Sequence, residues 1–511
     1  KDELEISSIA AITFTDKAAS ELYNRISGLV DEHIVFCRDS EERKKLERIR
    51  RQLVSANIST IHSFCTAILR DYPVESNLDA RFIPIDENLS LELIEMSVEE
   101  TIRNSFDDKS RSEDVKYLIR ILGSKSRLLN QLVKLIQNRK NVKVLQEKIY
   151  SQDESLIAEY FSNTFKELFI EIWNHYKYNF SEPLNKINNQ VLSSDPDNEL
   201  ANHLKVLLQN LRERKTADEI ILLLNQIKEL IFTSTLTIKK RSYINKETGE
   251  SLETEIIEVE SLISDLHLFN LCEEDSEREI QLAYFGKILL KVFDSSLKTY
   301  ESKKKAEGYI DYEDILLNVK QLLQNPAVQN SLADKYKLIM VDEFQDTNEI
   351  QYQIFLPILD YLKKGNLFIV GDEKQSIYKF RDAEIEIFNL TRNDIQNVSS
   401  KKNLLVLPDS FRMSPEICAF SNHVFRKIFK EPVEIFGDVP AADLICARDG
   451  DTKGKIEFLI KYEDEETEVN EARLLITKLK QIKNESAYRF SDVTILVRKR
   501  KHFESLEKEL V

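Results

Sequence analysis

Two short apolar segments, each followed at once by acidic and polar residues, constrain this chain more than any other feature. Residues 338–341 read Leu-Ile-Met-Val and run directly into Asp342 and Glu343, while residues 367–370 read Leu-Phe-Ile-Val and run into Gly-Asp-Glu-Lys-Gln. Apolar runs of this length are typical of fully buried strands. Because ligands of open parallel sheets bind outside the carboxyl ends of the strands, we expect both polar segments at one binding edge.

The adjacent carboxylates Asp342 and Glu343 suit one chemistry in particular. In enzymes that act on nucleotide phosphates, one carboxylate of such a pair holds Mg²⁺ and the other orients or activates a water. The alternative is a pair of ordinary surface carboxylates at a strand end. The buried strand before the pair, and the Gln-Asp-Thr at residues 345–347 after it, favour a Mg²⁺-nucleotide site.

Short apolar strands alternate with amphipathic helices at the start of the chain, which implies a parallel sheet. Strands and helices are predicted in the order 9–12, 16–29, 58–61 and 64–72. The α/β pattern resumes near residue 309 and includes the strands at 337–341 and 367–370. After Arg412 a second α/β unit is expected, with strands at 455–460 and 493–497 around a helix at 469–482.

The stretch between about residues 85 and 300 has a different character. Apolar residues recur there at i, i+3 and i+4, which predicts a helical insertion. The segments with this spacing are 89–102, 115–122, 128–136, 156–178, 200–211, 217–231 and 280–297. Residues 234–244 and 252–259 instead have the composition of strands, with Asn-Lys-Glu-Thr-Gly between them, and predict a β-hairpin or a loop.

Composition excludes some classes of protein and leaves others open. The chain has no apolar run near the ~20 residues of a membrane span, and no signal peptide is visible, so we expect a soluble protein with no membrane partner. The five cysteines are scattered and include no Cys-x-x-Cys pair, which favours reduced thiols in the cytoplasm. The 72 basic and 88 acidic residues give a net charge of −16, which argues mildly against general electrostatic binding of DNA but allows a local basic and aromatic track.

Five segments, in order, resemble motifs of superfamily 1 helicases of the UvrD/Rep type. Residues 13–19 (Thr-Phe-Thr-Asp-Lys-Ala-Ala) resemble motif Ia, and residues 60–65 (Thr-Ile-His-Ser-Phe-Cys) resemble motif Ic in the form favoured by the RecB/AddA branch. Residues 342–347 resemble motif II, residues 371–383 motif III and residues 410–414 motif IV. A lone Asp-Glu pair would be weak evidence, but five motifs in the family's order leave little room for chance. The resemblance covers residues 1–85 and 305–425.

The resemblance implies an α/β fold: a RecA-like parallel-sheet core, interrupted by a large helical insertion and followed by the start of a second RecA-like domain. The expected parts are 1–84 and 305–410 for the first core domain, 85–304 for the insertion and 411–511 for an incomplete second domain. Both ends look cut, so we expect a fragment of a longer protein.

The resemblance also implies roles in ATP hydrolysis. Asp342 would hold Mg²⁺, Glu343 would position the attacking water, and Gln375 would sense the γ-phosphate. Arg412 would contact a nucleotide phosphate, for which its planar, always charged fork is well suited; the alternative is a surface arginine in an ordinary salt bridge. The family usually has Asn-Tyr/Phe-Arg-Ser at this point, whereas this chain has Ser-Phe-Arg-Met.

A second set of residues is implied to bind nucleic acid. Its members lie in the segments that resemble motifs Ia, Ic and III: Phe14, Thr15, Lys17, Thr60, His62, Tyr378, Phe380 and Arg381. Other readings stay open for some of them. Thr15 or Asp16 suits a helix cap, His62 suits a core histidine, and the aromatic rings suit core positions.

One expected element is missing. A phosphate loop of the form G-x-x-x-x-G-K-[S/T] does not occur in the chain. The family places this loop before motif Ia, and its motifs V and VI beyond motif IV, so we expect the isolated chain to be inactive as an ATPase.

The parent protein is expected to be an ATP-dependent helicase or translocase on single-stranded DNA, running 3′ to 5′ in double-strand-break repair and recombination. Its expected partners are duplex-end DNA and a second helicase-nuclease subunit. Two alternatives stay open, each with a degenerate nucleotide site: a non-enzymatic nucleic-acid-binding protein and a helical interaction protein.

Overall fold

A computed structural model describes the chain except residues 1–3, 215, 241, 267–275, 364, 377–384, 399–402, 430–438, 449–453, 461–470, 486–487, 500–501 and 511. The chain divides into two compact units, one made essentially of Lys1–Leu404 and the other of Leu405–Glu434 with Asp438–Val511. Among the described helices, none is both long enough and apolar enough to cross a membrane.

The first unit is built on a four-stranded parallel sheet with the order β2-β1-β5-β6. Its strands are β1 (Ile9–Thr13), β2 (Asn57–Thr60), β5 (Leu338–Val341) and β6 (Leu367–Ile369). Ile12 is in register with Val341, and Val341 with Ile369, so the strands end together at one edge. The four strands predicted from apolar runs are thus confirmed.

Helices from both ends of the unit build the core beside this sheet. Buried residues of α3 (Ile61–Asp71), α14 (Tyr312–Leu322), α15 (Pro326–Lys335) and α16 (Glu349–Ile358) pack with those of β1 and β5 in one cluster. Helix α1 (Asp16–Phe36) begins directly after β1, and α2 (Ser40–Gln52) packs against it. Segments separated by more than 250 residues therefore form one core.

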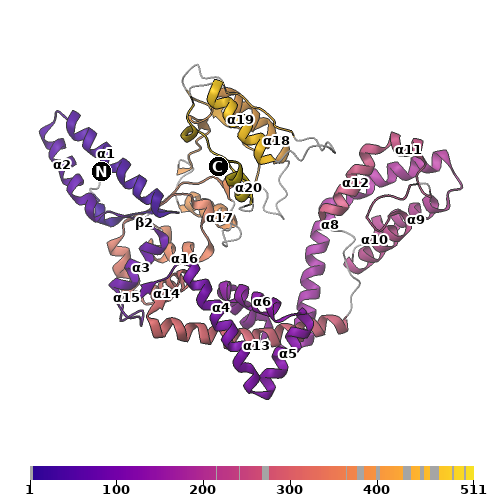
Figure 1. Cartoon of the computed structure of the whole chain (residues 1–511), viewed down its shortest axis with the longest axis horizontal. Coiled ribbons are helices and arrows are strands. Elements are labelled where there is room, and N and C mark those ends of the chain that lie inside the picture. Colours follow the sequence, from indigo (N-terminus) through magenta and orange to yellow (C-terminus); the bar gives the residue numbers. More distant parts are fainter. Residues whose placement is uncertain are drawn as a thin grey trace. The chain divides into compact units, whose positions relative to one another are not determined.

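A mostly helical insertion interrupts this core. The chain leaves through β3 (Ile83–Pro84) and returns through β4 (Tyr309–Ile310), and these two strands pair in parallel. One hydrophobic cluster of the insertion joins α4 (Glu87–Asn104), α5 (Lys109–Leu122), α6 (Lys125–Gln137) and α13 (Ser276–Glu307), which lie side by side in Figure 1. The other joins α8 (Glu154–Ser194), α9 (Glu199–Glu213), α10 (Ala217–Ile231) and α12 (Glu253–Leu266). The predicted fold, an α/β core with a helical insertion, is confirmed.

The strand prediction at 252–259 is wrong. This stretch lies in α12, preceded by α11 (Lys246–Ser251), whose first turn is capped by Asn245 accepting the Thr248 N–H. Val259 and Ile263, one helical turn apart, are both fully buried in the second cluster of the insertion. Among the described residues in and next to 234–244, two isolated bridges form, Phe232 with Ile238 and Lys240 with Ile244. Packing against α8 therefore outweighs the strand preference of the β-branched residues.

The strands predicted in the second unit are also wrong. In the part of this unit that the structure describes, residues 455–460 and 493–497 belong to no strand, and Leu496 is 89% exposed. The described part of this unit instead pairs β7 (Asp409–Ser410) with β8 (Ile445–Cys446) in parallel, and contains α18 (Pro415–Ile428), α19 (Glu471–Glu485) and α20 (Phe503–Leu510). An apolar run forms a strand only where a neighbour satisfies its backbone groups, and no described neighbour does so here.

A buried ionic cluster ties the insertion to the core. Arg139, at the start of α7 (Arg139–Leu145), has only 5% of its side chain exposed, and its guanidinium lies 2.6 Å from Asp311, 2.7 Å from Glu313 and 2.8 Å from Asp314. Lys304 of α13 contacts both aspartates. The Asp311 carboxylate also accepts hydrogen bonds from the Tyr300 hydroxyl at 2.7 Å and from the Asp314 N–H at 2.9 Å. The cluster therefore joins α7 and α13 of the insertion to the turn between β4 and α14.

Glu313 is the least well satisfied member of the cluster. Its Oε2 lies 2.7 Å from Arg139 but receives no well-directed hydrogen bond, and its Oε1 accepts only the Lys140 N–H at 3.2 Å. Burial raises the pKa of Glu313 to about 7; Arg139 opposes this shift, and the charges of Asp311 and Asp314 add to it. Asp311 is different, because Arg139 and Lys304 outweigh its burial and hold its pKa well below the ordinary value.

These opposite shifts predict a pH dependence of stability. A raised folded pKa means that the native state holds a proton that the unfolded chain has lost, so the contribution of Glu313 is complete below about pH 4.5 and falls as pH rises through about 7. Glu313→Gln should therefore gain on the order of 1–3 kcal/mol relative to wild type between pH 5 and pH 8. Urea unfolding of both proteins at these two pH values measures the difference. Equal pH dependence in the two proteins would count against the raised pKa.

Candidate nucleotide site and nucleic-acid track

The segments after β5 and β6 meet at the carboxyl edge of the sheet, as expected for segments that follow two neighbouring parallel strands. The Asp342 N–H donates to the Ile12 carbonyl at 3.0 Å, and the Phe344 N–H donates to the Val370 carbonyl at 2.9 Å. Asp342 and Glu343 are both exposed there, while Phe344 is fully buried behind them. The core ring thus anchors a turn whose two carboxylates face solvent.

Glu343 has an unusual backbone. Its φ of 51° and ψ of 43° place a non-glycine residue in the left-handed region, which costs roughly 1–3 kcal/mol. The turn is held by the Asp346 N–H, which donates to the Glu343 carbonyl at 3.0 Å, and by the Glu343 N–H, which donates to Asp342 Oδ1 at 3.1 Å. Strain maintained by its surroundings is typical of functional sites.

Gln345 links the two segments through its side chain. It is 2% exposed; its Nε2 donates to Glu343 Oε2 at 2.7 Å, and its Oε1 accepts the Asp372 N–H at 3.0 Å. The position of the Glu343 carboxylate is therefore coupled to the backbone of the segment after β6. Sequence reasoning gave Gln345 no role of its own; the signal in the sequence was its position in the Gln-Asp-Thr that follows the Asp-Glu pair.

Gly371 makes this link possible. A Cβ at this position would lie 2.6 Å from Gln345 Oε1 and 2.9 Å from the ring of Phe388. Gly371→Ala should therefore destabilise the first unit by about 1–3 kcal/mol, the usual cost of overpacking. The matched control is Gly28→Ala in α1, where nothing lies within 4 Å and helix propensity predicts a small gain. Urea unfolding of the two variants tests the contrast, and equal midpoints would mean that the segment moves aside at no cost.

Gln375 lies close to the same edge and rests on Asp372. Its Nε2 donates to Asp372 Oδ2 at 3.1 Å, and Lys374 lies 2.8 Å from Asp372 Oδ1. Burial raises the pKa of Asp372, but the hydrogen bonds from Lys374 and Gln375 outweigh burial and hold this pKa below its ordinary value. The anionic Asp372 therefore orients Gln375. Tyr378, Phe380 and Arg381, which follow it, lie outside the described residues.

The carboxylates at this edge fit a magnesium nucleotide. Asp342 is exposed, and no group of three or more candidate metal ligands converges among the residues that the structure describes. Mg²⁺ commonly uses one or two carboxylates together with waters and substrate phosphates, so a single exposed Asp342 suffices for this mode of binding. Burial, and next the charge of Glu343, raise the pKa of the neighbouring Asp346 to about 6.

The predicted nucleic-acid residues of the first two strands lie at the same edge, and two of them also serve as helix caps. Thr15 Oγ1 accepts the Ala18 N–H at 3.1 Å and caps α1, and Thr60 Oγ1 accepts the Ser63 N–H at 3.4 Å and caps α3. Phe14 is half-buried, and Lys17 is exposed beside Glu21. The capping alternative is therefore confirmed for Thr15. Thr60 is almost completely buried, with 9% of its surface exposed.

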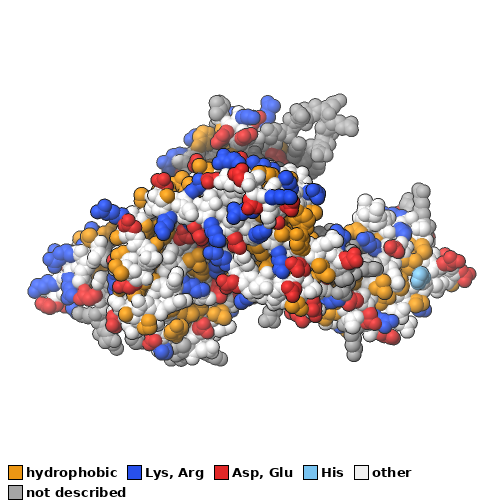
Figure 2. All heavy atoms as spheres, turned by 90° about the horizontal axis from the view of Figure 1, so that it is seen from below, with side chains coloured by type: hydrophobic (Ala, Val, Ile, Leu, Met, Phe, Trp, Pro, Cys, Tyr) orange, Lys and Arg blue, Asp and Glu red, His pale blue; other side chains and the backbone are white. Residues whose placement is uncertain are grey.

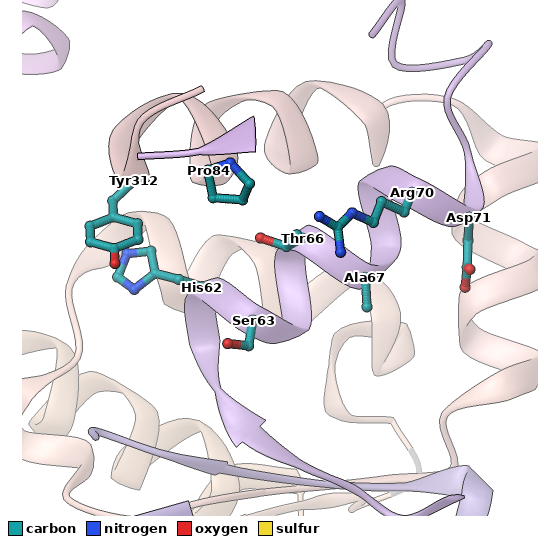
Figure 3. Close-up of a pocket in the computed structure, with 8 residues that line it drawn as sticks. All are labelled: His62, Ser63, Thr66, Ala67, Arg70, Asp71, Pro84 and Tyr312. Atoms are coloured by element: carbon teal, nitrogen blue, oxygen red, sulfur yellow. The ribbon is translucent and has the colours of Figure 1, made fainter. Parts of the chain in front are cut away.

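His62 lines a pocket that sequence reasoning did not find. The cavity has a volume of about 460 Å³ and lies between α3 and the turn that contains Tyr312 (Figure 3). The rings of His62 and Tyr312 have their centroids 4.7 Å apart at one end, and Arg70 and Asp71 line the other. A polar stripe at i, i+4 and i+8 of α3, formed by His62, Thr66 and Arg70, was the signal in the sequence.

Arg412 belongs to the second unit, where it follows β7. Its side chain is exposed, and its carbonyl accepts a hydrogen bond from Arg448 Nη1 at 3.0 Å. The contact of Arg412 with a nucleotide phosphate stays a prediction.

Comparison with known proteins identifies the family. The model of the UvrD/REP helicase N-terminal domain matches residues 1–239 and 186–396. An ATP-dependent helicase/nuclease subunit of Syntrophomonas wolfei is 27% identical over 462 residues, which cover 84% of this chain and 35% of that protein. Subunits of the same name from Staphylococcus carnosus and Streptococcus sanguinis are 24% and 25% identical over 95% and 97% of this chain, and over 41% and 43% of their own lengths. The chain thus spans about two fifths of these relatives, and, with the family model matched over most of its length, it belongs to the UvrD/REP helicase N-terminal domain family.

Proposed function

We propose that this chain forms part of an ATP-dependent DNA helicase or translocase. One observation carries the proposal: Gln345 joins the strained Glu343 to the segment that holds Gln375, all at the carboxyl edge of a parallel sheet. The Glu343 side chain is exposed, yet Gln345 holds its carboxylate at 2.7 Å. The relatives, which are named as ATP-dependent helicase/nuclease subunits, support the same reading.

The proposed chemistry assigns each residue at this edge a role. Asp342 holds Mg²⁺, which neutralises charge on the phosphates of ATP, and Glu343 positions the attacking water. Gln375, oriented by Asp372, contacts the γ-phosphate. Arg412 would contact a nucleotide phosphate. Because Gln345 touches both Glu343 and the backbone of Asp372, a shift of Gln375 on loss of the γ-phosphate is transmitted directly to the water-positioning carboxylate.

The nucleic-acid track is proposed to follow the same strand ends. The pocket beside His62 offers the Tyr312 ring, 38% exposed, to an unpaired base and the Arg70 guanidinium to a phosphate. Phe14, Thr15, Lys17 and Thr60 extend the track along the sheet edge, with Tyr378, Phe380 and Arg381 as further contacts. On the face drawn in Figure 2, basic and acidic side chains are interspersed, which fits a local track better than a broad basic surface.

For the whole protein, of which this chain would be a part, we propose a direction of movement, a pathway and a partner. It would move 3′ to 5′ along single-stranded DNA from duplex ends, in double-strand-break repair and recombination in the cytoplasm, beside a second helicase-nuclease subunit. The names of the relatives, which call each of them one subunit of a helicase/nuclease, support a partner of this kind. A non-enzymatic nucleic-acid-binding protein is the alternative, and it gives no role to the link from Glu343 through Gln345 to the segment after β6.

Binding of single-stranded DNA tests the proposal on this chain. Tyr312→Ala should weaken the affinity for a fluorescent oligonucleotide by about 1–3 kcal/mol, the value of stacking one base on an aromatic ring, with little sequence preference. Tyr178→Ala removes a tyrosine that is 71% exposed on α8 and serves as the control. Wild-type affinity in Tyr312→Ala would remove the pocket from the track.

Arg381→Ala should flatten the salt dependence of affinity by about one unit of slope.

A further inference from the structure

Tyr312 is held on both sides by the buried ionic cluster. Asp311 precedes it and caps α14, and Glu313 and Asp314 follow it in the first turn of the helix. Arg139 contacts all three carboxylates, whereas Lys304 contacts only the two aspartates. The residues on either side of Tyr312 are thus held by two cations of the insertion, Arg139 and Lys304, and of these two only Arg139 also contacts Glu313.

Arg139 differs from the other members of the cluster by its origin. Lys304 and Tyr300 are close neighbours of Asp311 in sequence, while Arg139 comes from α7, 172 residues away. Three carboxylates within four positions of one turn repel each other unless a cation is placed among them. The planar fork of arginine reaches three carboxylates at once, which the point charge of a lysine does not reproduce.

We propose that Arg139 is a positioning residue that holds the Tyr312 ring against His62 and so couples the helical insertion to the nucleic-acid pocket. The proposal rests on the proposed function, because the pocket has a use only if it binds a strand. The ring pair at 4.7 Å between centroids is the geometry that Arg139 maintains. A displacement of the insertion that moves α7 would open this pair and loosen the grip on the base.

The ring geometry is measured without DNA. The chain has seven histidines, and the NMR signal of labelled His62 is identified by its absence in His62→Gln. Tyr312→Ala gives the position of this signal without the neighbouring ring current. Arg139→Lys should move the His62 signal most of the way toward that position. Arg120→Lys, an exposed arginine of α5, should leave it unchanged.

The DNA arm of the experiment is a double-mutant cycle. Arg139→Lys and Tyr312→Ala should each lower the affinity for single-stranded DNA, Tyr312→Ala by about 5- to 150-fold. The double variant should bind no more weakly than Tyr312→Ala alone, because Arg139 acts only through the ring. Affinities are taken per folded molecule, with the folded fraction from thermal melting, so a variant that merely unfolds is recognised.

The two hypotheses fail in different ways. If Tyr312→Ala leaves DNA affinity unchanged, the pocket is no part of the track, whatever the His62 signal does. An unmoved His62 signal in a folded Arg139→Lys protein overturns the positioning role, even where Tyr312→Ala weakens DNA binding. Additive losses in the double variant overturn it as well, since they show Arg139 acting apart from Tyr312.

Discussion

Glu343→Gln in the intact protein is expected to slow ATP hydrolysis by about 10²–10⁴-fold while leaving MgATP binding nearly unchanged. The amide keeps the size and the hydrogen-bonding reach of the side chain but loses the charge that positions and activates a water. Steady-state hydrolysis with saturating single-stranded DNA gives the rate, and equilibrium binding of a fluorescent ATP analogue gives the affinity. Near-normal turnover would mean that another group positions the water.

A second variant in the same turn tests whether Glu343 must be held in place. Gln345→Glu keeps the size of the residue that holds Glu343 but replaces its Nε2 donor with an acceptor, so the 2.7 Å hydrogen bond to Glu343 is lost. Hydrolysis should fall in this variant too, by less than in Glu343→Gln, because the carboxylate is still present but no longer held. A Gln345→Glu protein with wild-type hydrolysis would show that the strained backbone alone orients Glu343.

Arg139→Met is expected to lower the free energy of unfolding by about 3–5 kcal/mol, because it removes one partner of a buried ion cluster and leaves charges uncompensated. Glu313 would keep only the Lys140 N–H, while Asp311 would keep Lys304 and Tyr300. Urea unfolding measures the loss.

Two further variants show whether charge is the cause. Arg120→Met removes an exposed arginine from α5 and should change stability by less than about 0.5 kcal/mol. Adding Glu313→Gln to Arg139→Met should recover part of the loss, since it removes the carboxylate that Arg139 left unpaired. A loss below about 1 kcal/mol in Arg139→Met would indicate that water reaches the cluster.

Local patterns were sufficient to locate the sheet. The runs at 338–341 and 367–370 are short, apolar and followed by polar residues, and they form β5 and β6. The order of the strands in the sheet could be predicted from the sequence only in part. Strand β1 lies between β2 and β5, which are more than 270 residues apart in the chain. Sequence spacing carries no information on pairing across so long an insertion.

Local patterns failed where tertiary contacts decide. Residues 252–259 carry β-branched residues, yet they are helical because Val259 and Ile263 fill the core beside α8. Residues 455–460 have the composition of a strand but lack a described partner, so Phe458 and Ile460 stay 73% and 64% exposed. In the first case, neighbours distant in sequence outweigh the preference of the segment itself, whereas in the second no described neighbour pairs with the segment.

The sequence by itself determined which residues are candidates for the chemistry, since the pair Asp342 and Glu343 after a buried strand already predicts a magnesium-nucleotide site. Only the tertiary structure decided how these residues are held: the left-handed backbone of Glu343, the bridge through Gln345 to Asp372, and the pairing of His62 with Tyr312. The physical reason is that chemical type is a property of each residue and its immediate neighbours. Distance, burial and strain arise instead from contacts between segments that the chain brings together only on folding.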